Sequence, residues 1–415
     1  MNNIMKCGFC ESNNLHIFVD LGIMPPANAY VKANEAETYF PLRVYVCDAC
    51  KLVQVQKFET PENIFLDYAY FSSISRGWQK HCREYSEMII SNCNIDKNSF
   101  VVEIASNDGC LLKNFIAKGI PVVGVEPAKN VAASAIKNGV PTFCDFFNTE
   151  NAKKIINEHR QPDLIIANNV FAHTPDINDF AEGIRELLIP GGIVTFEFPG
   201  LRNLINEGQF DTIYHEHFYY YSLTIVQKIL IKHGLRVFHV ENLPTHGGSL
   251  RVYACHEHDQ THTINSSVEN ELEKEKNAGL NDLNVYLGFD KRVQQIKKNT
   301  LNYLLKCKEE GNRIVAFGAA AKGSTFLNYC GIKTDIVDYV IDETPYKQGL
   351  NMPGVQIPIY PLEKLAQDKP DIIIILPWNW KDEIAKKINF IGKNGGKAVT
   401  FIPDLQEHVF DGTML

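Results

Sequence analysis

The stretch "SFVVEIASNDGCLLKNFIAKG" (residues 99–119) decides the fold that we expect for the middle of the chain. Its apolar run "FVVEIA" is typical of a buried parallel strand, "SNDG" predicts a turn, and Leu111, Leu112 and Phe115 predict the start of a helix. Further strands are expected in "PVVGVEP", in "PTFCDFF", which carries Asp145, and in "DLIIANNVFAHTPD" and "GGIVTFEFPG". "LRVFHVENL" and "GGSLRVYACH" look like a closing antiparallel pair. This order predicts a doubly wound α/β sheet with ligands at the carboxyl ends of its strands.

The turn after the strand "FVVEIA" indicates which kind of ligand the sheet can bind. Glu126 ends the second predicted strand, where an acidic side chain in such folds accepts hydrogen bonds from a ribose. A dinucleotide site would pair this acid with G-x-G-x-x-G, but residues 105–109 read Ala-Ser-Asn-Asp-Gly, with one glycine. Because a pyrophosphate needs close backbone approach, this turn suits an uncharged linker or an amino acid better.

At this point the middle segment resembles a class I S-adenosylmethionine-dependent methyltransferase. The resemblance implies that Glu103 to Gly109 surround the methionine part of the cofactor, with Glu126 on the ribose and Asp145 near the adenine. The implied cofactor-binding residues are Glu103, Ala105, Asn107, Asp108, Gly109, Glu126, Pro127, Asp145, Asn168 and Asn169. Ala105 stands where glycine is usual in that family. The alternative is an α/β domain that binds another nucleotide.

Two CxxC pairs mark the N-terminal segment. "CGFC" contains Cys7 and Cys10, and "CDAC" contains Cys47 and Cys50. This doubled spacing predicts tetrahedral zinc, and four thiolates leave no open coordination position, so the role is structural. The alternative is four incidental thiols. Between the pairs, "VDLGIMPPANAYV" predicts a turn-rich connection and "YFPLRVYVCDAC" a strand.

Size and composition limit the classes of protein to consider. The chain has 415 residues, enough for two or three domains, and we expect them at 1–75, 76–256 and 257–415. A net charge of −8 does not favour nucleic acid or an anionic membrane as a partner. There is no apolar run typical of a secretory signal or a membrane span. With eleven cysteines, these features predict reduced thiols and a cytoplasmic location.

The run Tyr214-His215-Glu216-His217 could serve three purposes. Two histidines two positions apart could share a metal on one face of a strand. They could also be surface histidines beside the packed "FYYYS". The third interpretation is acid–base catalysis, because a histidine can remove a proton and a tyrosine can stabilise an enolate.

Nearly the whole chain resembles the sugar C-methyltransferases that act on nucleotide-linked 4-keto-deoxysugars. The four-cysteine module, the methyltransferase core, "YHEH" and a second α/β domain carry this resemblance. It implies active-site roles for Tyr214, His217, His173 in "NNVFAHTPD" and Tyr70 in "YAYFSS", with Glu216 as a substrate contact. His246 in "THGGSLRVY" is a further candidate, with a plain turn histidine as the alternative.

The chemistry expected for such an enzyme begins with a carbon acid. A 4-keto group makes the hydrogen on C3 acidic, and its removal leaves an enolate whose carbon attacks the sulfonium methyl group. His217 is our first choice for the base and Tyr214 our second. We expect the S-adenosylmethionine site and the sugar site to adjoin.

The last part of the chain predicts a nucleotide site. "RIVAFGAAAKGSTFLNYCG" predicts strand, small-residue turn and helix, and the N–H groups there, with Lys322, favour a diphosphate. The resemblance makes this domain the site of the nucleotide sugar, dTDP-linked as first choice. The implied residues are Lys322, Gly323, Ser324, Lys347 and Trp378. For Trp378 the alternative is packing at a domain interface.

Two other functions remain open from the sequence. A nucleotide-dependent oxidoreductase could use either α/β domain, although no G-x-G-x-x-G is present at the first turn. A non-catalytic nucleotide-sugar-binding protein could retain a degenerate methyltransferase core. We expect a monomer or a weak homo-oligomer.

Overall fold

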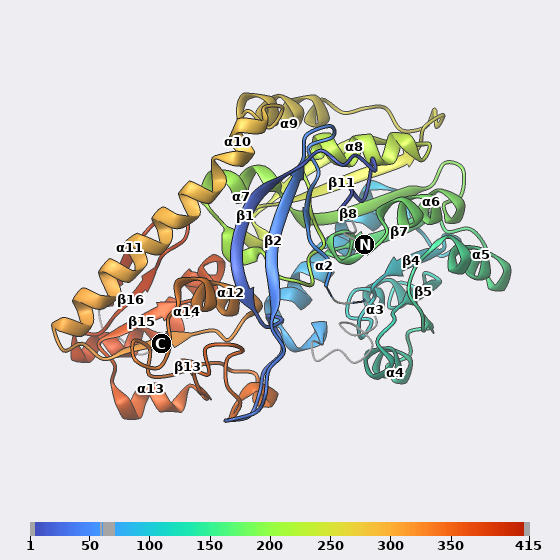
Figure 1. Ribbon diagram of the computed structural model, residues 1–415. Coiled ribbons are helices and arrows are strands. Elements are labelled where there is room, and N and C mark those ends of the chain that lie inside the picture. The colour runs from blue at the N-terminus through green and yellow to red at the C-terminus, as the bar shows by residue number, and fades with distance from the viewer. Residues whose placement is uncertain (1–4, 59, 61–70, 411–415) are drawn as a thin grey trace.

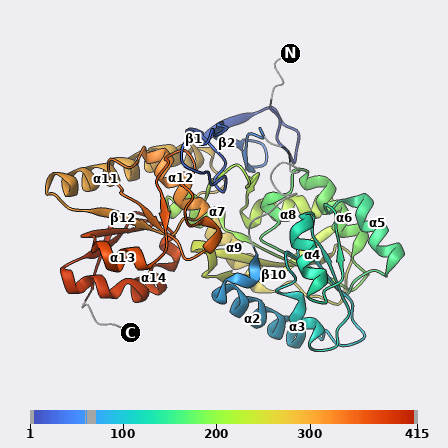
Figure 2. The ribbon, with the colours of Figure 1, turned by 90° about the horizontal axis from the view of Figure 1, so that it is seen from below.

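The computed structural model describes residues 5–58, 60 and 71–410, and three sheets organise this part of the chain (Figure 1). Strands β1 and β2 lie between two larger α/β units, and the view from below shows the same arrangement (Figure 2). Within the described residues, no helix is both long enough and apolar enough to cross a bilayer.

The first sheet joins the N-terminal cysteine segments to a strand far along the chain. Its order is β1-β2-β3-β9, antiparallel throughout. The bounds are β1 (Leu15–Met24), β2 (Phe40–Cys47), β3 (Val53–Val55) and β9 (Tyr219–Tyr220). The strand predicted in "YFPLRVYVCDAC" is confirmed. The turn-rich connection predicted for residues 19–31 is wrong for residues 19–24, which pair with β2 and bury Val19, Leu21 and Met24.

The second sheet is the predicted doubly wound sheet. Its order is β10-β11-β8-β7-β4-β5-β6. Strands β8, β7, β4, β5 and β6 are parallel to one another, whereas β11 pairs antiparallel with both β8 and β10. The bounds are β4 (Val101–Ile104), β5 (Val122–Val125), β6 (Thr142–Phe143), β7 (Leu164–Asn168), β8 (Ile193–Pro199), β10 (Leu235–Leu243) and β11 (Ser249–His256). Asp145 was predicted on the third strand, but β6 ends at Phe143, so Asp145 lies in the following loop.

Helices cover both faces of this sheet because its central strands are apolar on both sides. Val101 and Leu164 pack with α2 and α3, whereas their neighbours Val102 and Ile165 pack with α5 and α6. The helices of this unit are α2 (Arg76–Asn92), α3 (Leu112–Ile116), α4 (Lys129–Lys137), α5 (Thr149–Glu158), α6 (Ile177–Leu187), α7 (Leu201–Glu207), α8 (Leu223–Lys232) and α9 (Ser266–Asn277).

The strand order reverses next to β4. From β4 the chain passes to β5 and β6 on one side, and then to β7 and β8 on the other. The loops after β4 and β7 therefore diverge, which leaves a crevice at the carboxyl ends of these strands. Glu103 and Asn168 lie at those ends.

The third sheet has the order β14-β13-β12-β15-β16-β17, parallel except for β17. Its strands are β12 (Ile314–Phe317), β13 (Val340–Ile341), β14 (Ile359–Tyr360), β15 (Ile372–Ile375), β16 (Lys397–Thr400) and β17 (Gln406–Val409). Its helices are α10 (Leu283–Leu287), α11 (Phe289–Glu309), α12 (Ala321–Cys330), α13 (Glu363–Asp368) and α14 (Lys381–Ile388). The 3-10 helices η2 (Phe171–His173), η3 (Phe210–Thr212) and η4 (Thr245–Gly247) carry or flank several of the predicted site residues.

The three units share hydrophobic cores. One core joins Phe18 of β1 and Leu204 of α7 to Phe289 of α11, with Phe18 and Phe289 stacked at 4.5 Å. A second joins Cys47 to Phe196 of β8. The apolar contacts thus hold the first sheet against both larger units.

Candidate active site

A cavity of about 1230 Å³ opens at the reversal point of the second sheet, and all three units contribute to its wall. Asn28 comes from the first unit, Glu126 from the second and Lys322 from the third. The predicted site residues on the wall are Glu103, Ala105, Asn107, Glu126, Pro127, Asp145, Asn168, Asn169, His173, Tyr214, Glu216, His217, His246, Lys322 and Lys347. The fold therefore brings the predicted cofactor, catalytic and nucleotide residues to one cavity.

Some predicted residues do not line this cavity: Asp108, Gly109, Gly323, Ser324 and Trp378. Asp108 is buried and accepts a hydrogen bond from the Ser73 backbone N–H at 3.2 Å. The Trp378 indole N–H donates to Asp211 Oδ2 at 2.7 Å, so this ring packs where two units meet. Tyr70 lies outside the described residues.

The turn at residues 105–109 is built from left-handed backbone. Ala105 has φ +56°, Asn107 φ +51° and Gly109 φ +76°. A Cβ on Gly109 would lie 2.6 Å from a Val140 methyl group, so this glycine is required by space as well as by φ. Glu126 fixes the turn by accepting the Asn107 N–H at 3.0 Å. Ala105 thus adopts the strained conformation at which the family usually has glycine.

Buried polar groups at the strand ends fit the methionine end of S-adenosylmethionine. Glu103 Oε2 and both polar atoms of the Asn168 amide are buried, and no hydrogen-bond partner is found for them within the described residues. Burial also raises the pKa of Glu103 well above its usual range. Such groups are costly unless a ligand satisfies them, and a ligand with polar donors and acceptors would do so.

His217 is held as a neutral imidazole against the cavity. Its Nδ1 lies 3.2 Å from the Thr212 carbonyl oxygen, which can only accept, so Nδ1 carries the proton and Nε2 keeps a lone pair. Burial lowers the pKa of His217 well below its usual value, and the neighbouring His173 lowers it further. The ring centroids of Tyr214 and His173 lie 4.1 and 4.7 Å from that of His217. His217 therefore presents an unprotonated Nε2 at neutral pH, in a cluster with the rings of Tyr214 and His173.

Glu216 faces the cavity beside this cluster, whereas His215 does not line it. Burial raises the pKa of Glu216 to about 7. The Asn28 side-chain amide nitrogen lies 3.0 and 2.8 Å from the two carboxylate oxygens. His215 is buried with its ring 6.1 Å from that of Phe40. In the part of the chain that the structure describes, "YHEH" belongs to no cluster of metal-ligating side chains.

Two partly buried lysines mark the side of the cavity formed by the third unit. Lys322, in the first turn of α12, donates to Asn379 Oδ1 at 2.6 Å, and Lys347 donates to the Ala319 carbonyl oxygen at 2.7 Å. Burial lowers the pKa of both ammonium groups. The N-cap residue of α12 is Ala320, which has no polar side chain to cap the helix, and the first N–H groups of the helix lie near Lys322. This arrangement suits an anionic group.

The four predicted zinc ligands lie together. Cys7 Sγ lies 3.6 Å from Cys50 Sγ, and Cys10 Sγ lies 3.6 Å from Cys47 Sγ. All four sulfur atoms lie within 4.8 Å of one another, as tetrahedral zinc requires. The set fits a structural zinc ion.

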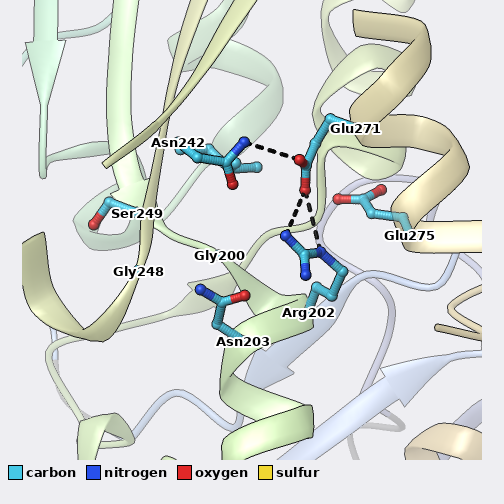
Figure 3. Close-up of a pocket in the computed structure, with 9 residues that line it drawn as sticks. Gly200, Arg202, Asn203, Asn242, Gly248, Ser249, Glu271 and Glu275 are labelled. Atoms are coloured by element: carbon cyan, nitrogen blue, oxygen red, sulfur yellow. Dashed lines mark hydrogen bonds and ion pairs between the residues drawn. The ribbon is translucent and has the colours of Figure 1, made fainter. Parts of the chain in front are cut away.

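A second cavity, of about 10 Å³, lies between α7 and α9 (Figure 3). That volume suits about one water molecule. On its wall Glu271 accepts from Arg202 Nη2 at 3.0 Å and from Asn242 Nδ2 at 2.9 Å (Figure 3). Because these charges are paired, they anchor α9 to the second unit.

Sequence reasoning missed several wall residues, namely Asn28, Tyr30, Trp78, Tyr346 and Trp380. The signal for Asn28 was the run "MPPAN", in which two prolines stiffen the chain just before a short polar side chain. The separation of 188 positions between Asn28 and Glu216 hid their pairing.

Comparison with known proteins agrees with this geometry. Three family profiles match in order: "Putative zinc binding domain" at residues 7–65, "Methyltransferase domain" at 79–240 and "C-methyltransferase C-terminal domain" at 244–403. C-methyltransferase NovU of Streptomyces niveus is 32% identical over 404 residues, which is 97% of this chain and 96% of NovU. A ubiquinone biosynthesis O-methyltransferase of Bartonella tribocorum is 26% identical over 28% of this chain and 47% of its own length.

Two solved structures resemble less than half of the chain. The magnesium protoporphyrin IX methyltransferase ChlM of Synechocystis, solved with its cofactor bound, has a TM-score of 0.33 at 14% identity, over 43% of this chain and 79% of its own. The PH0226 protein of Pyrococcus horikoshii has a TM-score of 0.37 at 16% identity, over 48% of this chain and 99% of its own.

The doubly wound sheet, the methyltransferase profile and the cysteine cluster define an S-adenosylmethionine-dependent methyltransferase with a structural zinc site. The match to NovU is more specific because it extends over nearly the full length of both chains. The chain belongs to the C-methyltransferase family.

Proposed function

We propose that the protein transfers a methyl group to a carbon, C3 as first choice, of a nucleotide-linked 4-keto-deoxysugar. The observation that supports this proposal is the shared cavity, which joins the turn at residues 105–109, the His217 imidazole and the Lys322 ammonium group. Methylation at carbon requires a base, a donor for the developing oxyanion and an adjoining methyl donor.

His217 and Tyr214 divide the proton chemistry. His217 Nε2 takes the C3 proton, and the Thr212 carbonyl oxygen orients the ring and favours the imidazolium that forms. Burial raises the pKa of Tyr214 well above its usual value, so its hydroxyl keeps its proton. Tyr214 therefore serves as a hydrogen-bond donor to the enolate oxygen.

The remaining wall residues bind and orient. S-adenosylmethionine supplies an electrophilic methyl group when it is bound. Glu126 accepts hydrogen bonds from the ribose, and Glu103 and Asn168 bind the methionine end. Glu216 accepts a hydrogen bond from a sugar hydroxyl. Lys322 and Lys347 bind the diphosphate of a dTDP-linked sugar.

The test is mass spectrometry of dTDP-4-keto-deoxysugars incubated with the enzyme and S-adenosylmethionine. We expect a gain of one methyl group on carbon, and loss of the C3 hydrogen to D2O in the presence of S-adenosylhomocysteine. Methylation of an oxygen, or no exchange at C3, would contradict the proposal. Binding of NAD without binding of S-adenosylmethionine would favour the oxidoreductase alternative.

A further inference from the structure

Within the described residues, the hydrogen bonds to the Glu216 carboxylate come from Asn28, in a different unit of the protein. Asn28 Nδ2 lies 3.0 Å from Glu216 Oε1 and 2.8 Å from Oε2, so one amide bridges both oxygens. Glu216 is 4% exposed, whereas Asn28 is exposed, and both line the large cavity. A buried carboxylate needs such donors, because burial favours its neutral form.

Asn28 is held at this position from both sides. Its segment leaves β1 through Pro25 and the buried Ala27, and the Ala29 N–H bonds the Pro26 carbonyl oxygen at 3.1 Å. Beyond it, the Tyr30 hydroxyl donates to the Ala319 carbonyl oxygen of the third unit at 2.5 Å. Val31 then forms a β-bridge with Asn351. The segment is therefore a fixed strap between the first and third units.

Among the described residues, the other groups that interact with Glu216 offer it no strong counter-charge. Tyr214 and Tyr220 interact with its charge, and the His173 imidazole bonds its backbone carbonyl oxygen rather than its carboxylate. The remaining titratable group of the cluster, His217, is held neutral by burial. Ionisation of Glu216 thus depends chiefly on Asn28.

We propose that Asn28 is a positioning residue, which favours the ionised form of the Glu216 carboxylate and orients it toward the sugar subsite. The proposal rests on the proposed function, in which Glu216 accepts a hydrogen bond from a sugar hydroxyl. It assigns the first unit a role in the chemistry beyond zinc binding, because the strap completes the wall of the site.

The test uses Asn28→Asp and Asn28→Ala in the full-length protein, with Lys32→Ala on the same strap as control. Lys32 is exposed and does not line the cavity. Infrared difference spectra against Glu216→Gln follow the ionisation of Glu216 without any substrate. We expect a midpoint near pH 7 in the wild type. It should rise by about one pH unit or more in Asn28→Asp, where two carboxylates face each other.

Kinetics provide the second readout. At pH 7, kcat/KM for the sugar should fall by about tenfold in Asn28→Ala and by about a hundredfold or more in Asn28→Asp. S-adenosylmethionine affinity should stay unchanged in both. The double variant Asn28→Asp/Glu216→Gln allows one hydrogen bond with reversed polarity but lacks the Glu216 carboxylate, so kcat/KM should not recover.

The two readouts separate the two proposals. An infrared midpoint that does not move in Asn28→Asp overturns the role of Asn28, whatever the enzyme methylates. A midpoint that moves in a protein that methylates no keto sugar supports the role of Asn28 and overturns the proposed function. Equal losses in Lys32→Ala would show a structural effect of the strap and overturn the specific role.

Discussion

At the residue scale, neighbouring side chains of one short run have different surroundings. Tyr214, Glu216 and His217 reach the cavity, while His215 packs on Phe40. The residue types could be predicted from the sequence, since a Tyr, a Glu and two His in succession point to proton transfer. The sequence could not predict which histidine would face the site. This run is neither a helix nor a strand, so no regular periodicity assigns its side chains to a face.

Replacing His217 tests the proposed base. In His217→Ala, kcat should fall by about 10² to 10⁴, because the variant lacks the imidazole that removes the proton in the proposed mechanism. The affinity for S-adenosylmethionine, measured by calorimetry, should be unchanged. His258→Ala is the matched control, since His258 lies in an exposed turn away from the cavity. Parallel losses of kcat and of cofactor affinity in His217→Ala would instead indicate a folding role.

The pH dependence of the enzyme should report Glu216. Its pKa is raised to about 7, so the carboxylate gains a proton and loses acceptor strength as the pH falls through 7. We expect kcat/KM to decrease below that pH. His217 should add no limb there, since burial lowers its pKa well below the usual value and it stays neutral. Glu216→Gln should be slow but should lack the limb, and persistence of the limb in that variant would assign it to another group.

At the element scale, strand β9 connects the zinc site to residues 214–217, the proposed catalytic run. Val53 and Gln54 of β3 pair with Tyr220 and Tyr219 of β9. Gln54 also accepts the N–H of Gly8, between two zinc ligands, at 2.9 Å. The zinc module and its β2 strand could be predicted from the CxxC spacing and from alternation. The pairing of β3 with β9 could not, because both strands are short and lie far apart in the chain.

Loss of zinc should therefore disturb the catalytic run as well as the module. We expect one zinc ion per chain by elemental analysis, and its loss in Cys47→Ser. Amide hydrogen exchange in residues 214–222 should speed up in Cys47→Ser along with exchange in residues 44–55, because β9 loses its partner strand. Cys93→Ser, at the end of α2, should change neither. Faster exchange confined to residues 5–58 would contradict this prediction, because it would show that loss of zinc leaves residues 214–222 undisturbed.

At the scale of the whole molecule, the separate units could be predicted from the sequence, whereas the contacts between them could not. Alternating strands and helices predicted both α/β units, and the doubly wound sheet is confirmed. Cofactor and zinc predictions depended on local spacing and are confirmed as well. The shared cores were not predicted, since the contact of Phe18 with Phe289 depends on tertiary packing rather than on any local pattern.

These shared cores predict that the expected middle domain does not fold alone. A fragment of residues 76–256 would expose Leu201, Leu204 and Phe210, which are buried in the core shared with α11. We expect this fragment to aggregate and to lack a cooperative melting transition in calorimetry. The full-length protein should melt cooperatively. A fragment that melts sharply and binds S-adenosylmethionine as the whole chain does would show that the unit is autonomous.

The contacts of α12 and Trp378 with the segment before Tyr214 also limit how such enzymes can be recombined. Thr325 donates to the Ile213 carbonyl oxygen at 2.9 Å, and Trp378 donates to Asp211 at 2.7 Å. A hybrid made by swapping everything after residue 256 for the sequence of a relative would keep the old segment against a foreign α12. To exchange substrate preference between relatives, a crossover should therefore carry residues 209–214 together with the C-terminal unit, although the two segments are separate in the gene.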